Sequence, residues 1–424
     1  MPDLQKNSRY LVILLLAFFS LLTISKSFYY SSKDGGIDLR IRVVGSRLLA
    51  TGYSPYFFKW RPADGELLLN PGDNPKRLVN GNVVTPAVLY VIFPMTKIAY
   101  PAQRLAWTFL QLMAATAVII LLLRRYNGPS RLLPIAILIV GFLSTDVWLL
   151  HVERGQIYIF YALAFSLMYY IYTSRWKYNE FISGFIGGLF IFFRPFAGIV
   201  VLGFLLRGKI SWLKGWGAGI LVGILLFVVP RPALWQDYFH AMKEYNNETL
   251  GKTHTPAATI EAMPTVVEGA TNIGAGQGFN ISHLSALHTY MIRSGIAYTN
   301  TTSYLVYGLL LLVLSVLFLR TSSSPGMLFL FAFVVYILAE LVLVTHRNPY
   351  NVVQWIFPVF LLTEHYRARP FFILLMMALL LLHNFPFIFP FQGLLAELLL
   401  LGLSVYALVS VSHVKNKNEW VQLS

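Results

Sequence analysis

Long apolar stretches that are almost free of charge restrict the fold of this chain more than any other feature. They lie at residues 10–24, 105–123, 132–143, 157–172, 218–229, 304–319, 327–345, 371–382 and 394–411. A helix of about 20 apolar residues matches the roughly 30 Å hydrocarbon core of a bilayer. Only 12% of the 424 residues are charged, against about a quarter in soluble domains. The sequence therefore predicts an all-α polytopic membrane protein, with one integral membrane domain over residues 1–424.

The positions of lysine and arginine predict how the chain threads the membrane. These residues concentrate in cytoplasmic loops, and placing both termini in the cytoplasm makes every predicted inner loop basic, with about twelve spans. The net charge of +15 is then a topology signal, and we expect no nucleic-acid partner. Two long loops, about 29–103 and 230–301, fall outside the inner (plasma) membrane. Within the first, residues 83–100 contain two prolines and predict a short surface or re-entrant helix.

The first outer loop predicts an amphipathic helix that begins near Asp38 and ends near Gly52. Four apolar residues are expected to face lipid, namely Ile41, Val43, Val44 and Leu48. Asp38 and Arg42 are four residues apart and therefore neighbours on one helix face. The aspartate either caps the helix and pairs with Arg42, or lies in a functional pocket.

Several motifs in this loop and beyond resemble one family in the same order. The string Asp38-Leu-x-Ile-x-Val-Val-Gly45-x-x-Leu-Leu-Ala-x-Gly52-x-x-Pro55-Tyr56 resembles the first-loop motif of polyprenyl-phosphate-dependent glycosyltransferases of the C-type (GT-C) membrane fold. Bacterial alpha-mannosyltransferases and arabinofuranosyltransferases are members. Further matching stretches are Gly155-Gln156, Arg194-Pro195 (where the family usually has Lys-Pro), Asn280-Ile-Ser282, and His346 followed by Tyr350.

The resemblance implies a reaction and a base. In the family, a sugar moves from a polyprenyl-phosphate donor to a hydroxyl of an outer-leaflet or periplasmic glycan or lipid acceptor. The aspartate of the first outer loop is the general base, and this role is carried over to Asp38. Asp34, one helical turn earlier, is the rival candidate. One base with direct displacement implies inversion at the anomeric carbon.

The leaving lipid phosphate requires cations at the membrane surface, and the planar fork of arginine suits phosphate oxygens. Candidates at the outer ends of spans are Arg40, Arg42, Arg154, Arg194, His346 and Arg347. Arg194 interrupts an apolar segment, where an unpaired charge costs about 3 kcal/mol. It either binds phosphate or pairs with a carboxylate or carbonyl at a helix kink. Expected sugar or acceptor contacts are Tyr53, Tyr56, Gln156 and Asn280.

No tight acidic pair or metal-ligand spacing occurs, so we expect no metal and no cofactor. A second class of function stays open from the residues alone. A flippase or transporter of lipid-linked glycans, or a glycan polymerase, would also need arginines and long outer loops. Polar residues cluster at the outer ends of spans rather than at their midplanes, which argues against a transporter. The first-loop motif at Asp38 favours the transferase over both alternatives, through its resemblance to the family.

Overall fold

A computed structural model describes residues 2–33, 36–70, 78–128, 130–249, 299–321, 324–343, 347–384 and 392–421, with 287, 291 and 294–296. For residues 2–8, 33, 248–249, 384 and 411–421 it describes the backbone alone. Throughout these residues the regular elements are helices. The prediction of an all-α polytopic membrane protein is confirmed.

Six helices in the described part of the chain are long and apolar enough to cross a membrane, or seven if one bent pair counts as a span. The six are α1 (Pro2–Lys33), α4 (Tyr100–Leu123), α10 (Ile210–Gly223) continued by η6 (Ile224–Val228), α13 (Asn300–Leu319), α14 (Pro325–Leu343) and α17 (Gln392–Val421). The bent pair consists of α5 (Leu132–Leu138) with η4 (Ile139–Leu143), and α6 (Asp146–Glu153), at 58°.

Several of the predicted spans are short or interrupted helices, which is why the long ones are fewer than the twelve expected. They are α7 (Tyr158–Tyr172), α8 (Asn179–Phe190), η5 (Pro195–Val200) with α9 (Val201–Leu206), η7 (Pro349–Trp355) with α15 (Ile356–His365), and α16 (Pro370–Asn384). Two of the interruptions coincide with a proline at the first helical position, Pro195 and Pro349. Proline removes a backbone donor and fixes its φ angle, so it ends the preceding segment.

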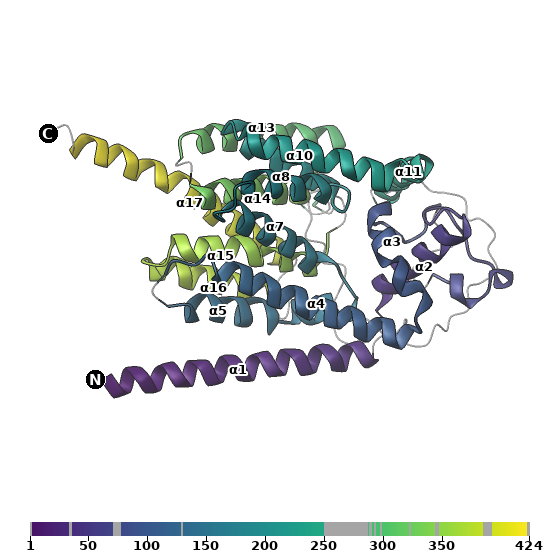
Figure 1. Cartoon of the computed structure of the whole chain (residues 1–424), viewed down its shortest axis with the longest axis horizontal. Helices are drawn as coiled ribbons and strands as arrows, with labels where there is room; N and C mark the ends of the chain where they lie inside the picture. The colour runs from purple at the N-terminus through teal and green to yellow at the C-terminus, as the bar shows by residue number, and fades with distance from the viewer. Residues whose placement is uncertain are drawn as a thin grey trace.

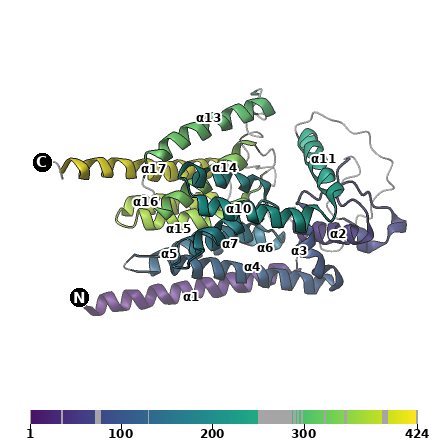
Figure 2. The same cartoon turned by 45° about the horizontal axis from the view of Figure 1, so that its top comes forward.

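Figures 1 and 2 show both chain termini at one end of the helical bundle, which we call the terminal end. The opposite end carries α2 (Ile37–Thr51), α3 (Pro86–Ile92) and α11 (Pro232–Thr249), and we call it the α2 end. Between α2 and α3 lie two short 3₁₀ helices, η1 (Pro62–Asp64) and η2 (Glu66–Leu68), and η3 (Phe93–Lys97) follows α3. Residues 83–100 thus form short helices beside α2, as predicted.

Helix α2 has the expected bounds, because a glycine in the left-handed region stands at each end. Gly36 precedes it with φ 53°, and Gly52 follows it with φ 84° and donates its N–H to carbonyl oxygens of the last turn. The expectation about its apolar face is wrong. Ile41, Val43, Val44 and Leu48 are buried within the protein rather than placed toward lipid, since α3 and η3 pack against α2.

The core centres on α14, whose side chains from Met327 to Val342 are all buried. Helices α7, α9, α13, α15 and α17 surround it. A helix that is apolar on every side needs such a covering of neighbours. Its position explains how one polar residue of this helix, Glu340, becomes enclosed by the bundle.

Helices α8 and α10 pack backbone to backbone through glycine. A Cβ atom at Gly188 would overlap the carbonyl oxygen of Trp216, and one at Gly184 would overlap that of Trp212. Small residues of this kind let membrane helices approach closely. Gly217 of α10 differs, because nothing lies within 4 Å of where its Cβ would be.

This contact gives a stability prediction. Gly188→Ala should lower the free energy of unfolding by about 1–3 kcal/mol, the usual effect of overpacking. Gly217→Ala should leave stability unchanged or raise it slightly, because alanine favours helix by about 1 kcal/mol. Thermal unfolding of both purified variants in the same detergent measures the difference. Equal melting temperatures would contradict the packing described.

Candidate active site

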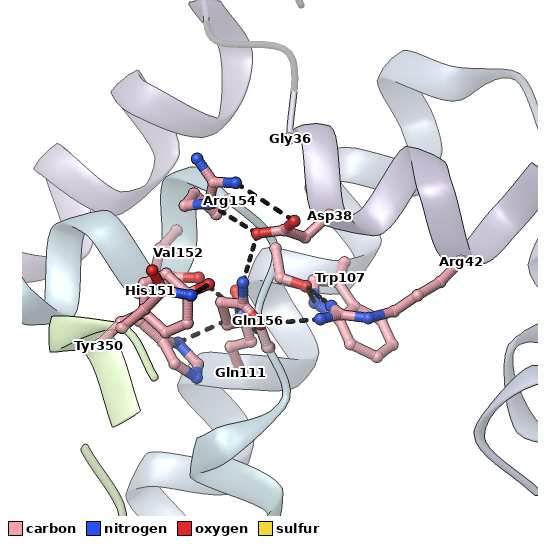
Figure 3. A network of polar contacts seen from close by, with 12 residues as sticks. Gly36, Asp38, Arg42, Trp107, Gln111, His151, Val152, Arg154, Gln156 and Tyr350 are labelled. Atoms are coloured by element: carbon pink, nitrogen blue, oxygen red, sulfur yellow. Dashed lines mark hydrogen bonds and ion pairs between the residues drawn. The ribbon is translucent and has the colours of Figure 1, made fainter. Parts of the chain in front are cut away.

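Asp38, the second residue of α2, is held by two residues that follow it by more than a hundred positions. Arg154 Nε lies 2.6 Å from Asp38 Oδ2, and Arg154 Nη2 lies 3.3 Å from Oδ1 (Figure 3). Gln156 Nε2 also donates to Oδ2. The side chains of Arg154 and Asp38 keep 14% and 18% of their surface exposed. The carboxylate is therefore fixed in orientation and still reachable from outside the protein.

The turn between α6 and α7, residues 154–157, presents these two partners. Gly155 adopts φ 71° there, and its carbonyl accepts from Arg42 Nη1 at 2.6 Å and from Trp107 Nε1 at 3.0 Å. Arg42 Nη2 donates to Gln156 Oε1 at 2.7 Å. Since the amide oxygen of Gln156 faces Arg42, its NH₂ group must face Asp38. Arg42 thus orients a partner of the carboxylate.

Buried polar residues behind the turn hold it in place. Gln111 Nε2 donates to the carbonyl of Gln156 at 2.8 Å. His151 is fully buried, stacks on Trp148, and its Nε2 accepts from the backbone N–H of Ile159 at 3.3 Å. Buried polar groups satisfied in this way rigidify their surroundings. His151 therefore helps to hold the α6–α7 turn in place.

A second group of charges lies inside the α2 half of the bundle, and we call it the buried ion-pair cluster: Arg194, Glu340, Arg347 and Glu397. Arg194 Nε donates to Glu340 Oε1 at 2.8 Å, and Arg194 Nη2 faces the same oxygen. Arg347 Nη2 donates to Glu397 Oε1 at 2.7 Å, and its Nε lies 3.6 Å from Glu340 Oε2. Two cations balance two anions, and only Arg194, at 21%, keeps appreciable exposure.

Neutral donors complete the coordination of both acids. Tyr336 donates its hydroxyl to Glu340 Oε1 at 2.5 Å, and Gln354 Nε2 donates to Oε2 at 2.7 Å. Trp355 Nε1 donates to Glu397 Oε1 at 2.8 Å. A buried ion pair repays its desolvation only when its remaining lone pairs are also satisfied. This cluster meets that condition at both carboxylates.

Two tyrosines connect Asp38 with the ion-pair cluster. The guanidinium carbon of Arg154 lies 6.0 Å from the centre of the Tyr350 ring. The Tyr350 ring lies 5.7 Å from that of Tyr158, and the guanidinium carbon of Arg194 lies 5.7 Å from the Tyr158 ring. These aromatic rings thus bridge the two charged groups.

The structure brings most of the predicted site residues together. Asp38, Arg42 and Gln156 form one network, and Arg194 and Arg347 form the adjoining cluster. Two others lie apart: Tyr53 is 51% exposed and packs on Phe58, while Tyr56 is buried and donates its hydroxyl to the carbonyl of Val84 at 2.9 Å. Asp34, Asn280 and His346 lie outside the described residues.

Reasoning from the sequence missed one ion pair and two acidic residues. The expected pair of Asp38 with Arg42 is replaced by Asp38 with Arg154, because the α6–α7 turn inserts between the two residues. Glu340 and Glu397 were not singled out, although each is a lone acid in an apolar run. Such an acid usually has a partner or a function. A lone acid in an apolar run is a signal that could have identified both Glu340 and Glu397 from the sequence.

Among the described residues, no three histidine, aspartate or glutamate side chains come together as a metal site would require. The expectation that no metal is needed stays a prediction.

A family model described as glycosyltransferase family 87 matches residues 84–345, which is more than half of the chain. The chain belongs to glycosyltransferase family 87. The resemblance to membrane glycosyltransferases is thereby confirmed. No curated protein and no solved structure shows a significant match to the chain.

The part of the chain matched by glycosyltransferase family 87 carries Arg154, Gln156, Arg194 and Glu340. Asp38 precedes the matched residues. The site thus joins a helix outside the family match to a turn inside it.

The buried ion-pair cluster predicts a large stability effect. Glu340→Ala should lower the free energy of unfolding by about 3–5 kcal/mol, because it leaves Arg194 and Arg347 short of an anion in the interior. The matched control is Glu180→Ala, which removes a pair with Lys209 at 3.4 Å whose side chains are about one third exposed. That change should cost at most about 1 kcal/mol. Thermal unfolding in detergent compares them, and similar shifts would refute the role of the cluster.

Proposed function

We propose that this member of glycosyltransferase family 87 transfers a hexosyl or pentosyl group from a polyprenyl-phosphate donor to a glycan or glycolipid at the outer leaflet or in the periplasm. The observation that carries the proposal is the partly exposed carboxylate of Asp38, clamped by Arg154 and Gln156. An acid held at a fixed angle and open to a substrate is what a general base requires.

In the proposed reaction, an acceptor hydroxyl oxygen attacks the anomeric carbon of the sugar. The new carbon–oxygen bond forms as the bond between that carbon and the phosphate oxygen breaks. The electron pair of the broken bond leaves with the lipid phosphate, and the proton of the hydroxyl moves to Asp38. One displacement of this kind inverts the anomeric configuration.

The two oxygens of Asp38 have different surroundings. Oδ2 receives Arg154 Nε at 2.6 Å as well as the amide of Gln156, whereas among the described residues Oδ1 has only the longer 3.3 Å contact with Arg154 Nη2. Oδ1 is thus the oxygen with room to take the proton.

Among the cations of the site, Arg194 is the best placed to meet the leaving phosphate. Its Nε and Nη2 face Glu340, while Nη1 has no protein partner in the described part of the chain. Arg42 directs both of its Nη groups to the α6–α7 turn, and Arg347 is enclosed by Glu340 and Glu397. We infer that Arg194 contacts phosphate and that Arg42 and Arg347 act by holding other groups. His346 stays a candidate from the sequence.

We infer the side of the membrane on which the site lies from the distribution of basic residues in the loops. Arg125 donates to the carbonyl of Tyr170, and Arg207 donates to the carbonyl of Phe318. These contacts join loops at the terminal end of the bundle, opposite to α2. Basic residues in these loops are Arg124, Arg125, Arg131, Arg175, Lys177, Arg207, Lys209, Arg320, Arg367 and Arg369. Cytoplasmic loops carry such an excess. The proposal therefore has both termini in the cytoplasm and the Asp38 site on the outer face of the inner membrane.

This orientation can be tested directly because the chain contains no cysteine. Glu66→Cys at the α2 end should react with a membrane-impermeant maleimide in intact spheroplasts. The matched variant Lys177→Cys at the terminal end should react only after lysis. Both positions are exposed in the folded protein. The reverse pattern would contradict the proposed sidedness.

The activity is tested with purified protein in lipid nanodiscs and a panel of short-chain polyprenyl-phosphate sugars. Asp38→Asn should reduce transfer at least about a hundredfold, the usual contribution of a positioned base. The control is Asp64→Asn in the same loop, whose carboxylate accepts from the backbone N–H of Arg61 at 2.7 Å. It should keep wild-type activity, and both variants should unfold at temperatures near that of the wild type.

Two results would change the proposal. If Asp38→Asn transfers sugar as fast as the wild type, the reaction class stands and Asp34 becomes the candidate base. A product with the anomeric configuration of the donor, seen by NMR, would contradict direct displacement.

A further inference from the structure

The proposed base and the proposed phosphate contact are joined by protein groups that no step above has used. In a direct displacement, the sugar ring must lie between the base and the leaving phosphate. The groups found between Asp38 and Arg194 are Tyr350 and Tyr158, each within 6.0 Å of a guanidinium or of the other ring. This inference rests on the proposed function.

We propose that Tyr158 is the sugar-binding residue of the donor site, contacting the transferred sugar with both its ring and its hydroxyl. Tyr158 is the first residue of α7 and follows directly on the turn that holds Asp38. Its ring lies 5.7 Å from the guanidinium carbon of Arg194. A sugar whose phosphate meets Arg194 would therefore meet the Tyr158 ring next.

The three tyrosines around Arg194 and Arg154 differ in what their hydroxyl groups do. The Tyr350 hydroxyl accepts from Asn348 Nδ2 at 2.7 Å, and the Tyr161 hydroxyl donates to the Phe193 carbonyl at 3.4 Å. Both of these side chains are buried. Tyr158 is partly exposed, and its hydroxyl has no hydrogen-bond partner among the described residues. Of the three, it alone offers a free phenol.

The chemistry of this group fits a hexose or pentose. The C–H face of a sugar ring is apolar and packs on an aromatic ring, while the phenol can donate to or accept from a ring hydroxyl. A site that hydrogen-bonds a substrate hydroxyl rejects analogues lacking it. Tyr158 would therefore determine which sugar is accepted, whereas Arg194 would bind the phosphate of every donor alike.

The test compares binding of two ligands to protein in nanodiscs, which needs no acceptor. One is the sugar-loaded short-chain polyprenyl phosphate that the wild type binds most tightly, and the other is polyprenyl phosphate without a sugar. The measured quantity is the ratio of their dissociation constants. Tyr158→Phe, which removes only the hydroxyl, should weaken sugar-loaded binding about three- to tenfold. Tyr158→Leu, which also removes the ring, should weaken it further.

Both Tyr158 variants should bind sugar-free polyprenyl phosphate within twofold of the wild type. Two further variants serve as references. Tyr161→Phe changes a tyrosine that also lies over Arg194, at 5.6 Å, and should leave the ratio unchanged. Arg194→Lys should weaken the binding of both ligands by a similar factor. If Tyr158→Phe binds the sugar-loaded lipid more tightly than Tyr158→Leu does, the aromatic ring itself contributes to sugar binding.

The outcomes are distinguishable from those of the proposed function. If the wild type prefers the sugar-loaded lipid but Tyr158→Leu leaves the ratio unchanged, the assignment of Tyr158 is overturned while the transferase stands. If Tyr158→Leu weakens the binding of both lipids by the same factor, Tyr158 acts through Arg194, and this result also overturns the assignment. If the wild type binds neither lipid, the proposed donor class itself fails and Tyr158 falls with it.

Discussion

The ion pair between Asp38 and Arg154 is the contact on which the rest of the site depends. It ties α2, at one end of the molecule, to the turn between α6 and α7 within the bundle. Arg42 and Trp107 fix the same turn through the Gly155 carbonyl, so three separate segments converge on one carboxylate. A base must be oriented before the substrate arrives, and a paired arginine and amide achieve this without closing off the second carboxylate oxygen.

The buried ion-pair cluster imposes a second constraint. Charges inside a membrane bundle persist only when they are balanced and hydrogen-bonded. Glu340 meets this need for Arg194 by holding two of its nitrogens, which leaves the third without a partner among the described residues. The same contact therefore stabilises the bundle and sets the direction of a cation. Tyr158 and Tyr350 connect this cation to Asp38, so the proposed base, the proposed ring platform and the proposed phosphate contact follow one another in space.

Sequence patterns predicted the class of fold and the local form of α2, because long apolar runs and glycine at helix ends are local signals. They also singled out Asp38, Gln156 and Arg194. They could not predict the partner of Asp38, because Arg154 reaches it only through the tertiary contact of the α6–α7 turn with α2. Burial of Ile41 and its neighbours was missed for the same reason: an apolar helix face looks alike whether lipid or protein covers it.

The central claim is that the α2 end of the bundle holds a base, a sugar platform and a phosphate contact in that order. A cryo-electron microscopy structure with a non-transferable polyprenyl-phosphate sugar bound in nanodiscs tests it most directly. The account predicts phosphate density beside Arg194, a sugar ring against Tyr158, and the anomeric carbon facing the Asp38 carboxylate. A lipid phosphate bound at the terminal end, among its basic loops, would contradict it.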